Sequence, residues 1–450
     1  MKCLRSVLFY TLILATACLG ARAAPENKIT MGIDASSLET IYLHPEKITA
    51  DFEGFWTTDD AYQLVARIHR NNNLQIPMEE WKKKIIGIDR MPLEERKSNK
   101  GFIVARQILA LEKKFRTEGI PHLKSFLPAD TRGFSKMIYL TSEINFRCFM
   151  TNGNVVVNVN AGYFQGDAEG IMNSLVHEVF HIGYGFNRYY RSEAPLEDEQ
   201  RYFFLDALQN EGLATYVGYT ARTIFKADHE KDYNMLDDEL EFEKALKKVN
   251  HLFTKALSPE GRNLKSESWQ IGVTERAYYV LGGVMARTID QKLGRDKLVD
   301  TIKKGPRSFV TLYNSLVPQK RKVVEFPAPT KITLFQKLKS ALMESRLKDI
   351  KFIKAELLKS PQPPDPKLTK QLNGLGYAML YKERLTDAID IFTINTTLFP
   401  GNANAFDSLG EAYMVSGHRE AAIKHYQQSL KLNPKNQNAK QMLKKLTAAQ

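Results

Sequence analysis

The chain has 450 residues, of which 43% are hydrophobic and 26% charged. That length provides for two or three domains with sizeable cores, and the composition is globular, not that of a disordered or fibrous protein. The formal net charge is +13 at pH 7. Because the basic residues are scattered along helix-like segments with acidic residues between them, we predict no nucleic-acid partner and interpret the basic run at 319–322 as a solvated linker.

The first residues of the chain have the pattern of a leader. Basic residues precede an apolar run of about a dozen, and small residues follow around Ala21 and Ala23, as in a signal peptide. We therefore predict a signal peptide over 1–23 and an exported protein, periplasmic or secreted. The alternative is a lipoprotein anchored at Cys18. This is the one membrane attachment that we predict, because no later stretch approaches the roughly eighteen apolar residues that a membrane span requires.

The order of apolar residues changes along the chain. Residues 35–127 carry apolar side chains three and four apart, which predicts a helical lobe. From residue 137 the short runs MIYLTSE, FRCFMT and NVVVNVN predict strands, and Asn152-Gly153 between the last two predicts a hairpin because both residues accept positive φ. A helix is expected next, with Asp167 as its N-cap and its end at the glycines 183 and 185.

That predicted helix carries His177, Glu178 and His181. Residues four apart lie on one face of a helix, so the two histidines can direct ring nitrogens to one point with Glu178 beside it. This spacing predicts a Zn²⁺ site. The alternative is two partly buried helix histidines next to a surface glutamate.

A catalytic zinc site takes three protein ligands and keeps one position open for water. We predict Glu211 as the third ligand, because its helical neighbours are small and indicate a face pressed against another helix. These neighbours are Ala207, Ala214, Thr215 and Gly218. Asp206, Glu199 and the remaining acidic residues at 193–200 are the alternatives, although they lie beside bulky aromatic residues or in an acid-rich segment.

The pattern His177-Glu178-x-x-His181, followed by Asn210-Glu211, resembles the gluzincin branch of zinc metallopeptidases. More narrowly, it is similar to an uncharacterised bacterial group of exported zinc-dependent peptidases. The resemblance covers about 137–315, with 29 residues between His181 and Glu211, more than in compact members. It implies a zincin-like fold in which an edge strand above the motif helix holds an extended peptide, and residues 155–160 are the expected strand.

The resemblance also implies catalytic roles. Glu178 would be the general base, and a tyrosine from a later helix would stabilise the oxyanion. In ERAYYVLGGVMARTID we assign that role to Tyr279, with Tyr278 as the alternative and core packing open for both. Asn210 would contact substrate, fix the adjoining backbone or pack between helices.

A repeat of 34 residues occupies the end of the chain. Residues 375–400 superimpose on 409–434 when shifted by 34, and small residues and prolines coincide. The matching pairs include Gly376 with Gly410, Ala388 with Ala422, and Pro400 with Pro434. This period resembles the tetratricopeptide repeat, whose small residues let two helices cross closely. We expect a degenerate repeat that includes 333–358, a capping helix over 435–447 and a domain boundary at 326–331.

These patterns predict an α+β, mostly α protein. A zincin-like metallopeptidase domain over 24–325, made of the helical lobe 35–127 and the zinc-site part 137–315, precedes a tetratricopeptide (α-solenoid) domain over 326–450. The predicted function is hydrolysis of a peptide or protein substrate by an exported zinc peptidase whose repeats recruit a protein partner or the substrate. The alternative is a scaffold that retains zinc without turnover and binds protein partners through the repeats. Glu178 favours the enzyme, because it has no purpose in a scaffold.

Overall fold

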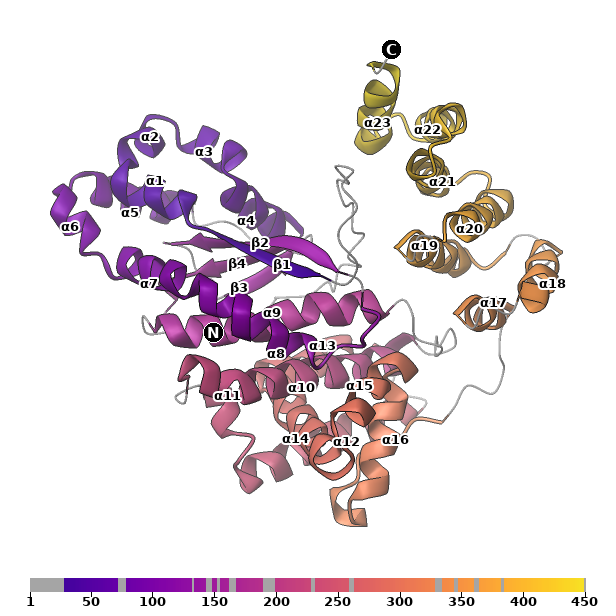
Figure 1. Cartoon of the computed structure of the whole chain (residues 1–450), viewed down its shortest axis with the longest axis horizontal. Coiled ribbons are helices and arrows are strands. Elements are labelled where there is room, and N and C mark those ends of the chain that lie inside the picture. Colours follow the sequence, from indigo (N-terminus) through magenta and orange to yellow (C-terminus); the bar gives the residue numbers. More distant parts are fainter. Residues whose placement is uncertain are drawn as a thin grey trace. The chain divides into compact units, whose positions relative to one another are not determined.

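The computed structural model is mostly helical, with one small sheet (Figure 1). It describes residues 28–71, 78–131, 133–142, 148–151, 154–161, 167–188, 199–227, 231–258, 263–327, 334–343, 347–359, 364–381 and 384–448. The predicted signal peptide and Cys18 lie outside these residues. The chain divides into two compact units, the first comprising 1–185 and 198–326 and the second 186–197 and 327–450. Among the described residues, no helix is both long and apolar enough to cross a bilayer.

The sheet of the first unit has the strand order β1-β2-β4-β3. Its strands are β1 (Ile29–Asp34), β2 (Phe134–Thr141), β3 (Cys148–Thr151) and β4 (Asn154–Asn158). β3 and β4 pair antiparallel, as predicted, with Thr151 opposite Asn154. β4 also pairs with β2 in parallel. The expectation of an edge strand at 155–160 is therefore wrong: both sides of β4 are paired, and β1 and β3 form the two edges of the sheet.

The predicted helical lobe is confirmed for the described part of 35–127. Its elements are α1 (Ser36–Leu43), α2 (Pro45–Ala50), α3 (Phe52–Thr58), α4 (Asp60–Asn71), α5 (Met78–Asp89), α6 (Leu93–Lys97), α7 (Lys100–Lys114), the π-helical turn η1 (Phe115–Gly119) and α8 (Ile120–Lys124). Buried aromatic rings of Trp56, Tyr62 and Trp81 pack within 5.0–5.7 Å of one another. The Tyr62 hydroxyl donates to the Ser142 carbonyl just beyond β2, which ties the lobe to the sheet.

The motif helix α9 (Ala168–Arg188) starts directly after Asp167, as expected, but continues past both glycines. Gly183 is buried, and a Cβ there would collide with the side chain of Leu127. This glycine therefore allows close packing against the segment after α8 and does not end the helix. The remaining elements of the unit are α10 (Glu199–Phe225), α11 (Lys231–Asn234), α12 (Glu239–Leu257), α13 (Lys265–Trp269), η2 (Gln270–Thr274), α14 (Ala277–Leu293), α15 (Arg295–Lys304), α16 (Pro306–Leu316) and η3 (Gln319–Arg321).

α10 and α14 pack along each other and cross at two glycines. A Cβ on Gly282 would lie 2.7 Å from Gly212 Cα, closer than real Cβ contacts come. Such an approach of two helix backbones requires residues without a side chain at the crossing. The crossing lies next to Glu211 and one turn from Tyr279, so it sets the distance between these two side chains.

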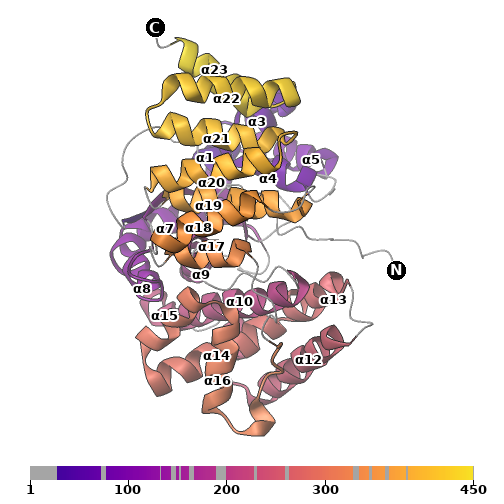
Figure 2. The same ribbon diagram turned by 90° about the vertical axis from the view of Figure 1, so that its right-hand side faces the viewer.

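The second unit is a row of helical hairpins (Figure 2). Its helices are α17 (Leu334–Met343), α18 (Leu347–Leu358), α19 (Pro366–Tyr381), α20 (Leu385–Leu398), α21 (Ala403–Val415), α22 (Arg419–Leu432) and α23 (Gln437–Ala448). Gly376 and Gly410 face the rings of Phe392 and Tyr426, at equivalent positions of two hairpins. The predicted repeat, the helical pair before it and the helix that caps it are all present.

Candidate metal centre

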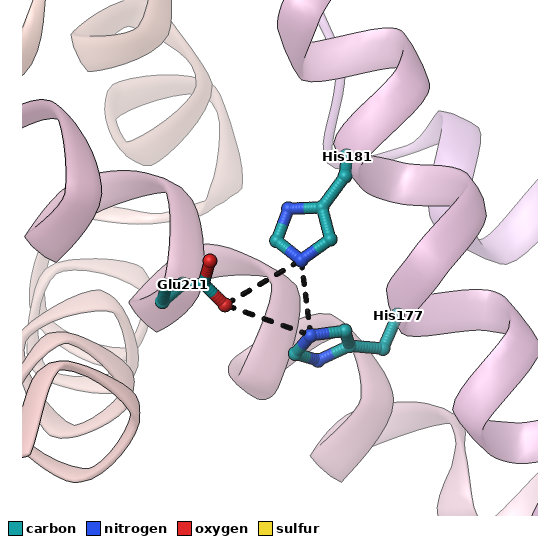
Figure 3. Close-up of side chains that lie close together, drawn as sticks. All are labelled: His177, His181 and Glu211. Atoms are coloured by element: carbon teal, nitrogen blue, oxygen red, sulfur yellow. Dashed lines mark hydrogen bonds and ion pairs between the residues drawn. The ribbon is translucent and has the colours of Figure 1, made fainter. Parts of the chain in front are cut away.

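Three side chains bring their donor atoms together between α9 and α10 (Figure 3). The Nε2 atoms of His177 and His181 lie 3.1 Å apart. Glu211 Oε2 lies 3.5 Å from the Nε2 of His181 and 3.9 Å from that of His177. Metal–ligand bonds of about 2.0–2.2 Å place the donors of a tetrahedral zinc site roughly 3.3–3.5 Å apart, so this triangle has the size that zinc requires.

The chemistry of the three donors also fits zinc. Two imidazole nitrogens and one carboxylate form a common donor set of catalytic zinc sites, in which a fourth position stays open. The side chains of His177, His181 and Glu211 are 13%, 10% and 7% exposed. Among the described residues, this is the group of histidines and carboxylates placed to hold a metal ion.

Helix geometry explains why the two histidines converge. They lie four residues apart on α9, on one face of the helix, and the rings meet edge to face with centroids 4.7 Å apart. Glu211 comes from the middle of α10 and reaches the same point from the other side (Figure 3). Sequence spacing places the two histidines on one face of α9, and the packing of α9 against α10 brings Glu211 to them.

The alternative ligands Asp206 and Glu199 lie away from the metal-binding group. Asp206 is buried on α10, where its Oδ1 accepts a hydrogen bond of 3.1 Å from the Tyr184 hydroxyl. Tyr184 also donates to Gln209 Oε1 at 3.0 Å, so these residues form a polar network between α9 and α10. Glu199 begins α10, twelve residues before Glu211 and therefore about 18 Å away along the helix axis. Neither residue belongs to the metal-binding group.

Asn210 occupies a position behind one of the ligands. Nδ1 of His181 donates to Oδ1 of Asn210 over 3.0 Å. This bond places the proton on Nδ1, so the lone pair of Nε2 points toward His177 and Glu211. Asn210 therefore orients a ligand, a role that differs from the three predicted for it. The signal in the sequence is its position directly before Glu211, which did not by itself distinguish these roles.

The two tyrosines of α14 point in different directions. Tyr278 hydrogen-bonds Ser268 Oγ at 2.7 Å and is buried in the core. The ring of Tyr279 lies parallel to the ring of His177, with a centroid distance of 6.0 Å and an interplanar angle of 4°. Burial and the charge of Glu211 raise the pKa of Tyr279 well above its ordinary value, and the charge of Glu178 adds to this effect. Tyr279 therefore stands at the metal-binding group and Tyr278 does not.

Glu178 lies partly buried on α9 next to His177. After burial and the charge of Glu211, its negative charge contributes to the raised pKa of Tyr279. The structure thus brings together the five residues selected from the sequence: the metal-binding group and, beside it, Glu178 and Tyr279.

Comparison with known proteins agrees with this geometry. Residues 100–322 match a protein family described as "Putative zinc dependent peptidase", and residues 403–436 match the tetratricopeptide repeat. The first match begins at α7, so it includes part of the helical lobe as well as the zinc-site part. No curated protein matches the chain. The predicted resemblance is confirmed: residues 100–322 are similar to this peptidase family, and residues 403–436 are similar to the tetratricopeptide repeat.

Proposed function

We propose that the protein is an exported zinc-dependent peptidase that hydrolyses peptide bonds in a peptide or protein substrate. The convergence of His177, His181 and Glu211 beside Glu178 and Tyr279 is the observation that supports it most strongly. The family match of residues 100–322 supports the same reaction class. Export is proposed from the leader pattern of residues 1–23.

Each residue has a distinct task in this proposal. His177, His181 and Glu211 hold the metal, and Asn210 keeps the ring of His181 in its binding orientation. Zinc held by these residues would supply a water of lowered pKa and a positive charge that polarises the scissile carbonyl. Glu178 takes the proton of the attacking water and delivers it to the leaving amine.

Tyr279 serves as the hydrogen-bond donor for the negative oxygen that develops on the scissile carbonyl. Burial and two nearby carboxylates raise its pKa, so the phenol keeps its proton across the physiological range. This hydroxyl hydrogen-bonds Glu211, and it would transfer its hydrogen bond to the oxyanion in the transition state. Loss of one such donor typically lowers kcat by about 10²–10³-fold.

The edge of the sheet offers a place for an extended substrate. β3 pairs with β4 on one side, and no other described strand pairs with it. A peptide strand could therefore add to β3 through main-chain hydrogen bonds, which provide affinity without demanding a particular sequence. We propose β3, in place of residues 155–160, as the substrate-holding strand. The repeats of the second unit would recruit a protein partner or a segment of the substrate.

Two matched substitutions test the roles of the glutamates. Glu178→Gln preserves size and removes basicity, so zinc should stay bound while peptide hydrolysis falls by roughly 10²-fold or more. Glu211→Gln makes the same chemical change at a ligand, so zinc affinity itself should fall. The measurements are zinc content at controlled free metal and turnover of a peptide library.

The outcomes separate the proposal from its alternative. Zinc loss in Glu178→Gln, or full zinc retention at low free metal in Glu211→Gln, would contradict the assigned roles. A wild-type protein that holds one zinc ion per chain and cleaves nothing in a broad library would instead be a zinc-retaining scaffold that binds protein partners through its repeats.

A further inference from the structure

Arg276 has an unusual backbone conformation directly before α14. Its φ of 63° and ψ of 14° lie in the left-handed region, which residues other than glycine seldom adopt. The residue joins the π-helical turn η2 to the first turn of α14. Strained conformations of this kind persist only where surrounding contacts hold them, and they often occur at functional sites.

The surroundings of Arg276 hold the junction in place. Lys248 of α12 pairs with the adjacent Glu275 at 2.8 Å, and the amide of Gln270 donates to the same carboxylate at 3.2 Å. On the other side, the ring of Tyr278 packs against Gly272, where a Cβ would collide with it. Contacts of Glu275 before Arg276 and of Tyr278 after it therefore hold this junction.

The side chain of Arg276 covers the face of Tyr279. Its Cζ lies 3.3 Å from the centroid of the tyrosine ring, within the range of a strong cation–π contact. The ring of Tyr279 in turn lies parallel to the imidazole of His177. The guanidinium thus contacts the ring of a tyrosine that itself lies parallel to a ring of the metal-binding group.

We propose that Arg276 is a positioning residue that holds the Tyr279 ring against His177, so that the phenol hydroxyl and the imidazole keep their orientations at the metal centre. This inference rests on the proposed peptidase function and extends it to a residue outside the metal-binding motif. The left-handed backbone matters because it turns the side chain back over the first turn of α14.

Arg276→Gly provides the sharpest test, because glycine adopts the left-handed conformation without strain while the guanidinium is lost. In the zinc-loaded full chain, we expect kcat to fall between about 3- and 30-fold, with KM and zinc content unchanged. Arg276→Lys keeps the positive charge and should recover part of the loss. If Arg276→Gly does not fold, Arg276→Asn takes its place in the test, because asparagine also tolerates positive φ.

A double-mutant cycle with Tyr279→Phe identifies the route of the effect. Phenylalanine keeps the ring and removes the hydroxyl, so the part of the effect that acts through the hydroxyl is absent and Arg276→Gly should lower kcat less in that background than in the wild type. An additional loss of the same size in the double variant would show that Arg276 acts independently of Tyr279 and would overturn the proposal. Unchanged kcat in Arg276→Gly would overturn it as well.

Cobalt(II) bound in place of zinc provides a readout that does not need peptidase activity. Its visible absorption reports the arrangement of the ligands, so Arg276→Gly should change the spectrum while the cobalt content stays at the wild-type level. If the wild type cleaves no peptide, the proposed function fails, but a changed spectrum would still support the positioning role. An identical spectrum in the two proteins would refute that role.

Discussion

Gly212 of α10 and Gly282 of α14 meet backbone to backbone, so closely that a Cβ on Gly282 would lie 2.7 Å from Gly212 Cα. Glu211 directly precedes the first glycine, and Tyr279 lies one turn before the second. The crossing therefore determines how near the carboxylate of Glu211 and the phenol of Tyr279 come to each other. Gly212 and Gly282 thus help to set the geometry of the candidate metal centre, although neither belongs to the metal-binding group.

Gly212→Ala should damage both the stability and the site. The added methyl meets the backbone of Gly282, which cannot move aside like a side chain, so we expect a loss of at least about 1–3 kcal/mol in the free energy of unfolding. Weaker zinc binding should accompany it. Urea denaturation and zinc titration measure the two effects.

Gly87→Ala is the matched control for that change. Gly87 lies inside α5, and a Cβ there meets nothing within 4 Å. Because alanine favours the helix, this variant should be more stable by up to about 1 kcal/mol, with unchanged zinc affinity. If Gly212→Ala and Gly87→Ala changed stability and zinc affinity alike, the close crossing of α10 and α14 would not be the cause of the loss in Gly212→Ala.

Asn210→Ala should weaken zinc binding. Removal of its Oδ1 frees the ring of His181, and loss of such an orienting partner typically lowers metal affinity by about 10–100-fold. Asn210→Asp keeps an acceptor oxygen and should retain most of the affinity. Competition with a chelator of known affinity measures both variants; equal zinc affinity in the wild type and Asn210→Ala would contradict the orienting role.

The two units should separate after Pro327. The segment before this residue belongs to the first unit, because Val324 N donates to Asn250 Oδ1 at 2.8 Å and the rings of Phe326 and Phe253 lie 4.8 Å apart. A chain that ends at Pro327 should therefore keep zinc and cleave short peptides. A chain that ends at Leu316 loses these contacts and should be less stable in thermal unfolding. Loss of zinc from the longer truncation would show that the repeats contribute to the fold of the site.

The repeat unit should lose stability as the pH rises. Burial raises the pKa of Glu411 on α21 from 4.5 to about 7, and the Tyr377 hydroxyl donates to its Oε2 at 2.8 Å. Since the folded pKa exceeds the unfolded one, the folded state binds the proton more tightly. The resulting stabilisation is complete below pH 4.5 and is lost as the pH rises through 7. The shift corresponds to at most about 3–4 kcal/mol.

Glu411→Gln isolates this contribution. Glutamine can still accept the hydrogen bond from Tyr377 but does not ionise, so the variant should be more stable than the wild type at pH 8. The difference in urea midpoint should shrink toward pH 4.5. A difference that does not depend on pH would mean that Glu411 titrates normally in the folded chain.

Local periodicity in the sequence was sufficient to predict several parts of this protein. His177 and His181 share a face because any α-helix brings residues four apart together, and their convergence needs no other element. The repeats were equally readable, since matching glycines, alanines and prolines recur every 34 residues. Each of these features depends on neighbours within one helix or one hairpin.

Tertiary structure decided what depends on contacts between distant segments. The sequence left Tyr278 beside Tyr279 as a candidate, and only the packing of α14 shows which ring faces His177. The edge strand was misplaced because the parallel pairing of β4 with β2 is not encoded in the hairpin itself. The role of Arg276 was also hidden, since a left-handed arginine has no signature in sequence spacing. Spacing fixes the faces of one helix, whereas the packing of helices and strands determines which faces meet.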